Sequence, residues 1–161
     1  MIRAATQDDA DAIARIYNHY ILNTVITFEE EPVSPTEMSG RIGKVQAAAL
    51  PYLVDERDEK VIGYAYAGRW HERSAYRYSV ETTIYLDSGH VGKHIGSALY
   101  AALLQQLEER GLHVAIGGIA LPNPGSVALH EKLGFRKVAH YTEVGFKFNR
   151  WVDVGYWQRV L

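Results

Sequence analysis

Cysteine is absent from all 161 residues of the sequence. Its absence excludes disulfide bonds, thiolate metal ligands and a covalent thioester intermediate on the protein. A strong excess of charge is also lacking, because 17 basic and 19 acidic residues leave a formal net charge of −2. The sequence therefore indicates no broad basic surface, and we expect neither nucleic acid nor an anionic membrane as its main partner.

Long apolar runs are missing as well. No uninterrupted apolar stretch approaches the ~18 residues of a membrane-spanning helix, and residues 1–6 lead into polar sequence without an apolar signal core. We therefore expect a cytoplasmic protein. The composition that is present, 47% hydrophobic and 22% charged, is typical of a globular chain with a substantial core. No repeat, low-complexity tract or shift in composition marks a linker, so we expect one domain over residues 1–161.

Apolar periodicity predicts a mixed α/β structure. Thr6 and Asp9 read as a capping box that opens a helix after a short strand over 2–5, and Ser34 followed by Pro35 opens a second helix. Alternation and turn signals place strands at 52–56, 61–69, 77–86, 113–121, from 135 onward and at 151–161. Two further helices are expected, from the loop 87–96 to 110–111 and over 126–133.

The loop between the strand at 77–86 and the next helix contains Gly92 and Gly96. Backbone N–H groups and the dipole of the helix can hold an anion at such a place, and a pyrophosphate fits that chemistry. The alternative is a turn that uses glycine only for backbone freedom, which the spacing alone favours. The segment is neither a Walker loop nor a Rossmann fingerprint, because the glycine intervals and the residues after them differ.

The segment 123–135 reads Asn-Pro-Gly-Ser-Val-Ala-Leu-His-Glu-Lys-Leu-Gly-Phe. It matches the pattern Asn-x-x-Ser/Ala-x-x-Leu-Tyr/His-x-x-x-Gly-Phe, and the sequence therefore resembles the GNAT superfamily of acetyltransferases. Further segments make the sequence similar to the phosphinothricin and methionine sulfoximine N-acetyltransferase group within it. These segments are 16–18, 27–29, 63–67, 76–81 and 144–148, and they span nearly the whole chain.

The resemblance implies an α/β (α+β mixed) fold. Its central mixed, mostly antiparallel sheet has six to seven strands, is splayed at the cofactor site and is flanked by about four helices. The implied reaction transfers acetyl from acetyl-CoA to the amino group of a small amino-acid-like acceptor, by direct attack in a ternary complex. The acceptor class is the phosphinothricin, methionine sulfoximine or methionine sulfone type. Two alternatives stay open: an enzyme acting on a protein N-terminus or lysine, since acceptor pockets are built from variable loops, and a CoA-binding module with little catalysis.

Acetyl transfer to an amine requires a base for the ammonium proton and donors for the charge that develops on the carbonyl oxygen. The resemblance assigns the base to Glu81, an acid in mid-strand whose pKa burial would raise toward working pH. A surface ion pair with Arg73 or Arg77 is the alternative. His130 stands where many superfamily members carry a tyrosine that protonates the departing thiolate, and an imidazolium can do the same. A capped or core-facing histidine is an equally weighted alternative.

The resemblance places the pantetheine arm along the main chain of 84–86 and the pyrophosphate at 92–97. The implied acetyl-CoA contacts are Ile84, Tyr85, Leu86, Gly92, Lys93, His94, Ile95, Gly96, Ser97, Asn123 and Ser126. Capping of the following helix is the alternative role of Ser126. The family's loop usually reads Arg/Gln-Gly-x-Gly-Ile/Leu-Gly, and this chain departs from it at Val91 and His94. His94 must either take a backbone conformation normal for glycine, at a cost of ~1 kcal/mol, or hold the loop somewhat differently, so we expect weakened but retained acetyl-CoA binding.

Acceptor contacts implied by the resemblance are Phe28, Arg73, Ser74, Ala75 and Tyr76. Arg73 or Arg77 is available for a bidentate pair with a substrate carboxylate. Lys147, Phe148 and Trp151 are candidates to reach a neighbouring subunit, because relatives commonly form homodimers. The seven histidines form no His-x-x-x-His or His-Glu-x-x-His pair on a predicted helix, so we expect no metal site.

Overall fold

A continuous sheet of seven strands organises the computed structural model, which describes residues 1–161. The spatial order is β1-β2-β3-β4-β5-β7-β6, and only the neighbours β4 and β5 are parallel. The strands are β1 (Ile2–Ala4), β2 (Tyr52–Arg57), β3 (Lys60–Arg69), β4 (Ser79–Leu86), β5 (Val114–Leu121), β6 (Arg136–Lys147) and β7 (Arg150–Val160). The helices are α1 (Ala10–Asn23), α2 (Pro35–Ala47), α3 (Ile95–Glu109) and α4 (Pro124–Lys132). The predicted mixed, mostly antiparallel architecture is confirmed.

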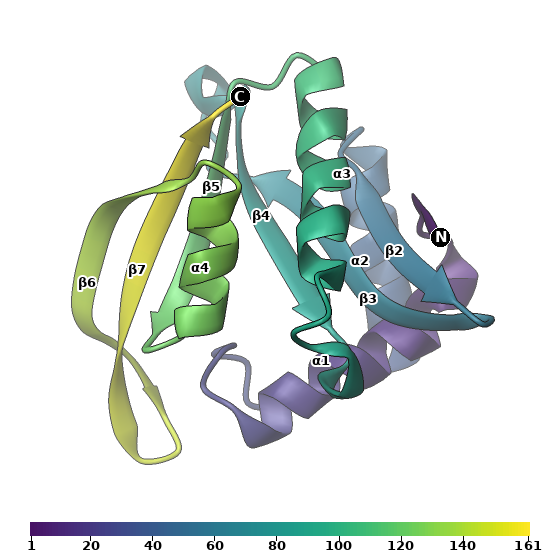
Figure 1. The fold of residues 1–161 in the computed structure, drawn as a ribbon, viewed down its shortest axis with the longest axis horizontal. Coiled ribbons are helices and arrows are strands. Elements are labelled where there is room, and N and C mark those ends of the chain that lie inside the picture. The colour runs from purple at the N-terminus through teal and green to yellow at the C-terminus, as the bar shows by residue number, and fades with distance from the viewer.

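Helices cover both faces of this sheet (Figure 1). Alternation along β2 and β3 divides the core in two, because successive side chains in a strand point to opposite faces. Tyr52, Val54 and Tyr64 pack with α1 and α2, whereas Leu53 and Ala65 pack with α3. None of the helices combines the length and apolarity required to cross a membrane.

Local capping signals explain where two of the four helices begin. The Ser34 side chain accepts a hydrogen bond from the Glu37 N–H at 3.1 Å, and Pro35 occupies the first position of α2, as predicted. The helix α4 begins two residues earlier than predicted, at Pro124. Its cap is therefore Asn123, whose side-chain oxygen accepts from the Ser126 N–H at 3.2 Å, and the alternative role of Ser126 as the cap is wrong.

The strand β4 also differs from the prediction at its start. Residues Ser74–Tyr76 form a 3-10 turn, so the strand begins at Ser79 and not at residue 77. The predicted hairpin between β2 and β3 is present. Its two turn residues, Asp58 and Glu59, have φ angles of 48° and 59°, the left-handed combination of a type I′ turn.

The strands β4 and β5 pair only near their starts. Parallel pairing joins Ser79 to Val114, Val80 to Ala115 and Glu81 to Ile116, and no pairing between the two strands follows. Farther along, β4 stays paired with β3 and β5 with β7, while the two strands diverge (Figure 1). The facing edges beyond this point present backbone N–H and C=O groups that no neighbouring strand satisfies. The sheet is therefore splayed beside Glu81.

Candidate active site

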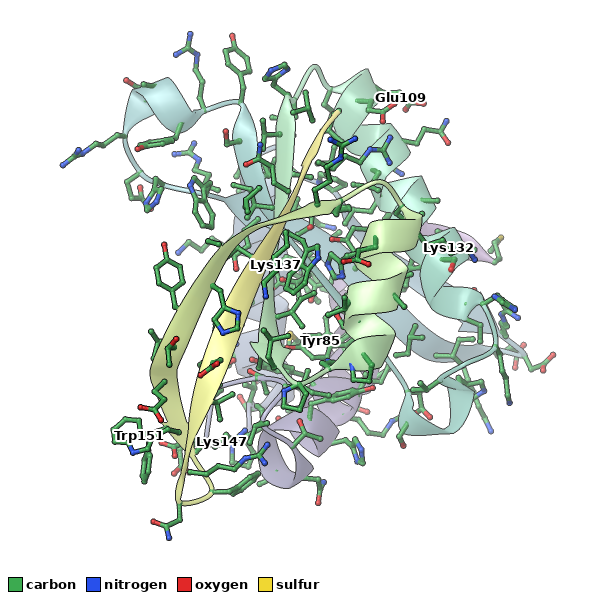
Figure 2. All side chains as sticks on the ribbon, turned by 60° about the vertical axis from the view of Figure 1, so that its left-hand side comes forward. Tyr85, Glu109, Lys132, Lys137, Lys147 and Trp151 are labelled. Carbon is green, nitrogen blue, oxygen red and sulfur yellow. The ribbon has the colours of Figure 1, made fainter.

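A cavity of about 260 Å³ occupies the splay between β4 and β5. Its walls come from β4, β5, β7, α4 and the irregular segment between α1 and α2. Tyr85, which is labelled in Figure 2, lines this cavity from β4. The lining side chains that bear on chemistry or shape are Phe28, Glu81, Tyr85, His130 and Tyr156. The predicted base therefore lines a space large enough for a small molecule.

A second cavity, of about 550 Å³, adjoins the first and extends to the loop before α3. The two cavities share the lining residues Ile26, Ile84, Tyr85, Asn123 and Ser126. They therefore form one continuous channel, which runs from Glu81 along the splayed edge of β4 to the N-terminus of a helix. A long ligand with an anionic end suits a channel of this shape, because the helix N-terminus favours negative charge.

The loop at the far end of the channel has the backbone expected of an anion-binding turn. Gly92 has a φ of 84°, and His94, which caps α3, has φ 59° and ψ 7°. The predicted glycine-like conformation of His94 is therefore present. Both residues line the channel together with Gly96 and Ser97, where the first N–H groups of α3 lack partners within the helix. These features fit a pyrophosphate.

The predicted contacts at this loop are not all brought to the channel. Lys93 is exposed and does not line it, and the Ile95 side chain packs into the core with 2% of its surface exposed. Only the backbone of Ile95 remains available to a ligand. Lys132, which we did not predict, lines the channel from α4, and its ammonium group donates to the Ser97 hydroxyl at 3.3 Å. This lysine adds a positive charge beside the turn.

The middle of the channel follows the main chain of Ile84, Tyr85 and Leu86. These residues pair with β3 on one edge, and their other edge faces the splay. The Leu86 carbonyl is the exception, because it accepts a hydrogen bond from the Tyr20 hydroxyl at 2.6 Å. Asn123 lines both cavities. Its side-chain oxygen is used in capping α4, so its NH₂ group is the part left to donate to a ligand carbonyl.

Glu81 is half-buried and forms neither an ion pair nor a side-chain hydrogen bond within the chain. Burial raises the pKa of its carboxyl group, while the charge of nearby His71 acts in the opposite direction. Arg77 instead packs over the Tyr78 ring at 4.7 Å and donates to the Ser74 carbonyl. The alternative of a surface pair between Glu81 and an arginine is therefore wrong. A desolvated carboxylate without a partner is suited to accept a proton from a ligand.

His130 lies in the lining of the same cavity, but its ring is 4% exposed and held from both sides. Its Nδ1 lies 2.8 Å from the Ser126 carbonyl oxygen, and its Nε2 lies 3.0 Å from the Tyr100 hydroxyl, which in turn lies 2.5 Å from the Thr82 hydroxyl. A carbonyl only accepts, so Nδ1 carries the proton and Nε2 accepts from Tyr100. Burial lowers the pKa of His130, so the neutral form is favoured. The core-facing alternative describes this geometry better than a general acid does.

Comparison with known proteins agrees with this geometry. Residues 2–155 match the family described as an acetyltransferase (GNAT) domain. The chain belongs to the GNAT family. The phosphinothricin N-acetyltransferase of Streptomyces viridochromogenes is 40% identical over 158 residues, which cover 98% of this chain and 86% of that protein. The L-methionine sulfoximine/L-methionine sulfone acetyltransferase of Salmonella typhimurium is 36% identical over 157 residues, 98% of this chain and 92% of that protein.

A solved GNAT structure confirms the fold. The phosphinothricin acetyltransferase of Sinorhizobium meliloti, in complex with acetyl-CoA, superposes with a TM-score of 0.97 at 39% identity. The match covers 100% of this chain and 88% of that one. The family, the fold and the class of enzyme, an acyltransferase that transfers to nitrogen, are thus as the sequence predicted, and acetyl-CoA is supported as the co-substrate.

The predicted acceptor residues of this GNAT enzyme are divided between the wall and the rim of the cavity. Phe28 lines the cavity itself. Arg73, Ser74, Ala75 and Tyr76 are exposed and do not line it. Of these four, Tyr76 is connected to the cavity through a series of aromatic contacts. Tyr76 packs on His71 at 5.0 Å, His71 on Trp70 at 5.0 Å, and Trp70 on Tyr156 at 5.7 Å, and Tyr156 lines the cavity.

Proposed function

We propose that this enzyme transfers the acetyl group of acetyl-CoA to the amino group of a small amino-acid-like acceptor. The observation that carries the proposal is the unpaired, half-buried carboxylate of Glu81 at the point where β4 and β5 separate. The acceptor class is the phosphinothricin, methionine sulfoximine or methionine sulfone type, which the names of the two relatives support. The cavity of about 260 Å³ beside Glu81 suits one amino-acid-sized molecule.

Glu81 takes a proton from the acceptor ammonium, directly or through one water, and thereby frees the nitrogen lone pair. The amine nitrogen then attacks the thioester carbonyl carbon, and the bond from that carbon to sulfur breaks as the thiolate departs. The proton still in excess on the nitrogen is lost to the thiolate or to water, which leaves the neutral amide and coenzyme A. Free N–H groups on the splayed edge of β4 are placed to donate to the carbonyl oxygen as negative charge develops on it. The reaction proceeds by direct attack in a ternary complex, and the absence of cysteine excludes a thioester intermediate on the enzyme.

The channel assigns the parts of acetyl-CoA to parts of the chain. Gly92, His94, Gly96 and Ser97 hold the pyrophosphate with backbone donors at the start of α3, and Lys132 adds its charge. Asn123 donates to an amide carbonyl of the pantetheine arm, which lies along 84–86. His130 keeps α4 in place against α3 and β5 and does not serve as the acid for the thiolate. Arg73, at the rim, pairs with the acceptor carboxylate.

The same proposal includes a cytoplasmic homodimer in which residues 1–161 of each chain form one domain. Support for the dimer comes from the outward face of the β6–β7 hairpin, which is apolar and exposed. Its members are Val144, Phe146, Phe148 and Trp151, and Trp151 has 63% of its surface exposed. Figure 2 shows Trp151 projecting outward from this hairpin. A patch of this kind is typical of a protein interface.

Light scattering tests the dimer. It should give twice the chain mass for the native protein and the monomer mass for Trp151→Glu. A monomer mass for the native protein contradicts the dimer.

A thiol-release screen tests the acceptor class. Purified enzyme with acetyl-CoA is supplied with phosphinothricin, methionine sulfoximine, methionine sulfone, ordinary amino acids, or peptides carrying a free N-terminus or a lysine. We expect thiol release with the small analogues, and acetylation of their amino group by mass spectrometry. Release with peptides alone contradicts the proposal and supports a protein acetyltransferase, and acetyl-CoA binding without release for any amine supports a binding module.

A further inference from the structure

The irregular segment between α1 and α2 forms one wall of the cavity through Thr27 and Phe28. The helices hold this segment from one side. The Tyr17 hydroxyl of α1 lies 2.8 Å from the Thr27 hydroxyl, and Arg41 of α2 donates to both carboxylate oxygens of Glu29 at 2.9 and 2.6 Å. These contacts fix the two residues on either side of Phe28.

The other side of the segment meets the end of β6. Side chains alternate along this strand, so Gly145 and Lys147 are buried whereas Val144 and Phe146 are exposed. The Lys147 side chain is long and charged, yet the residue is only 2% exposed, and its ammonium group donates to the Thr27 carbonyl at 2.8 Å. Buried lysines are rare unless they are paired, so this hydrogen bond is a specific contact.

Gly145 meets the neighbouring residue, Phe28. A Cβ atom built on Gly145 would overlap the Phe28 ring, with Cε2 at 2.5 Å and Cε1 at 2.9 Å. The backbone of Gly145 does not have the positive φ that favours glycine. Glycine is therefore required here by the ring that lies on it and not by the local conformation. A methyl group at residue 145 would therefore displace the Phe28 ring, which lines the cavity.

We propose that Gly145 and Lys147 set the position of the acceptor wall: Gly145 is a specificity-determining residue that seats the Phe28 ring, and Lys147 is a positioning residue that holds Thr27. The inference rests on the proposed function in one respect, that the cavity beside Glu81 receives the acceptor. The C-terminal hairpin thereby positions a pocket wall that is built by the first third of the chain. Lys147 and Thr27 are 120 residues apart in the sequence.

Steady-state kinetics with both substrates test whether Gly145 determines the position of the Phe28 ring. Gly145→Ala should raise the KM for methionine sulfoximine by about tenfold, the effect of roughly one methyl group in a tight pocket, while the KM for acetyl-CoA stays within about twofold. Adding Phe28→Leu to Gly145→Ala should restore most of the acceptor KM, because the smaller side chain leaves room for the new methyl group. Gly40→Ala is the control, since nothing lies within 4 Å of its added Cβ. An unchanged acceptor KM, an equal rise in both KM values, or no rescue by Phe28→Leu overturns the role of Gly145.

Hydrogen exchange tests the hold on Thr27 without any substrate. Lys147→Met removes the donor but keeps the length of the side chain, and it should speed amide exchange in 25–30 several-fold relative to the native protein. Lys44→Met, on the exposed side of α2, is the control and should leave these amides unchanged. Equal exchange in the native protein and Lys147→Met overturns the role of Lys147. If the native enzyme acetylates no small amine, the proposed function fails, while the exchange experiment still decides whether Lys147 holds the wall.

Discussion

Glu81 and Ile116 form the last parallel pair between β4 and β5 before the two strands separate. The candidate base therefore stands at the apex of the splay, where the sheet still holds its backbone and its side chain already faces the cavity. Rigid backbone on one side and an open channel on the other is the arrangement that a positioned proton acceptor needs. The same divergence exposes the β4 edge to which the proposed function assigns the acetyl donor.

The His94 backbone gives a prediction about acetyl-CoA binding. Its φ of 59° is tolerated by histidine better than by a β-branched residue, and glycine takes it without strain. His94→Val should therefore weaken acetyl-CoA binding and lower the free energy of unfolding by about 1–2 kcal/mol. His94→Gly should bind acetyl-CoA at least as tightly as the native enzyme. Calorimetric titration measures the acetyl-CoA affinity of both variants. Equal affinity of His94→Val and the native protein argues against a strained turn.

The buried imidazole of His130 predicts how stability depends on pH. Burial lowers its pKa below the ordinary value of 6.5, so the unfolded chain binds the proton more readily than the folded one. The stability contributed by neutral His130 is therefore complete above pH 6.5 and is lost as pH falls toward the folded pKa. Urea unfolding from pH 8 to 5 should show this decline.

Variants separate His130 from the other histidines. In His130→Phe, the free energy of unfolding should decline less between pH 8 and 5 than in the native protein. The variant should also be less stable by about 1–3 kcal/mol at pH 8, because the Tyr100 hydroxyl and the Ser126 carbonyl lose their partner. His113→Asn, at an exposed position, should keep the slope. Below its unfolding temperature, His130→Phe should keep most of the native kcat. A large drop in kcat with unchanged stability supports the general-acid role instead.

The turn between β2 and β3 predicts a stabilising change far from the chemistry. Asp58 and Glu59 both adopt positive φ, for which Asn-Gly is the preferred pair. Asp58→Asn with Glu59→Gly should raise the free energy of unfolding by about 1 kcal/mol with unchanged kcat and KM. Urea denaturation provides the measurement. A loss of stability contradicts the type I′ assignment.

Replacing the Glu81 carboxylate with a neutral side chain should stabilise the folded protein. Its folded pKa is raised above the ordinary value of 4.5 by burial, so the stability associated with the protonated form is present at low pH and is lost as pH rises through the folded pKa. Glu81→Gln should consequently unfold at a higher temperature than the native enzyme at pH 8, with the difference shrinking toward pH 4. Calorimetry over that range checks it. Equal melting temperatures at pH 8 imply that the carboxylate is solvated.

Local signals in the sequence predicted much of the fold. Ser34 with Pro35, the alternation along 79–86 and the glycines at 92 and 96 each act within a few residues, and the structure confirms them. The start of α4 was misjudged because Asn and Ser are both good caps. Proline is favoured at the first position of a helix, so Pro124 identifies Asn123 as the cap.

The contacts that sequence reasoning missed are long-range. Lys132 with Ser97, His130 with Tyr100, and Lys147 with Thr27 join elements whose approach depends on how helices and hairpin pack across the sheet. Periodicity gives the face of an element on which a side chain lies but not its partner on another element. Tyr156 was missed for the same reason, since one tyrosine among 11 carries no signal that it lines a cavity.

The most direct test of the account is the rate of thiol release by Glu81→Gln at saturating acetyl-CoA and methionine sulfoximine, with acetyl-CoA affinity measured on the same sample. Loss of the general base should lower kcat by about 10²–10⁴-fold, while the Kd for acetyl-CoA stays within about twofold of the native value. Native turnover by a folded Glu81→Gln enzyme contradicts the assignment of Glu81 as the base.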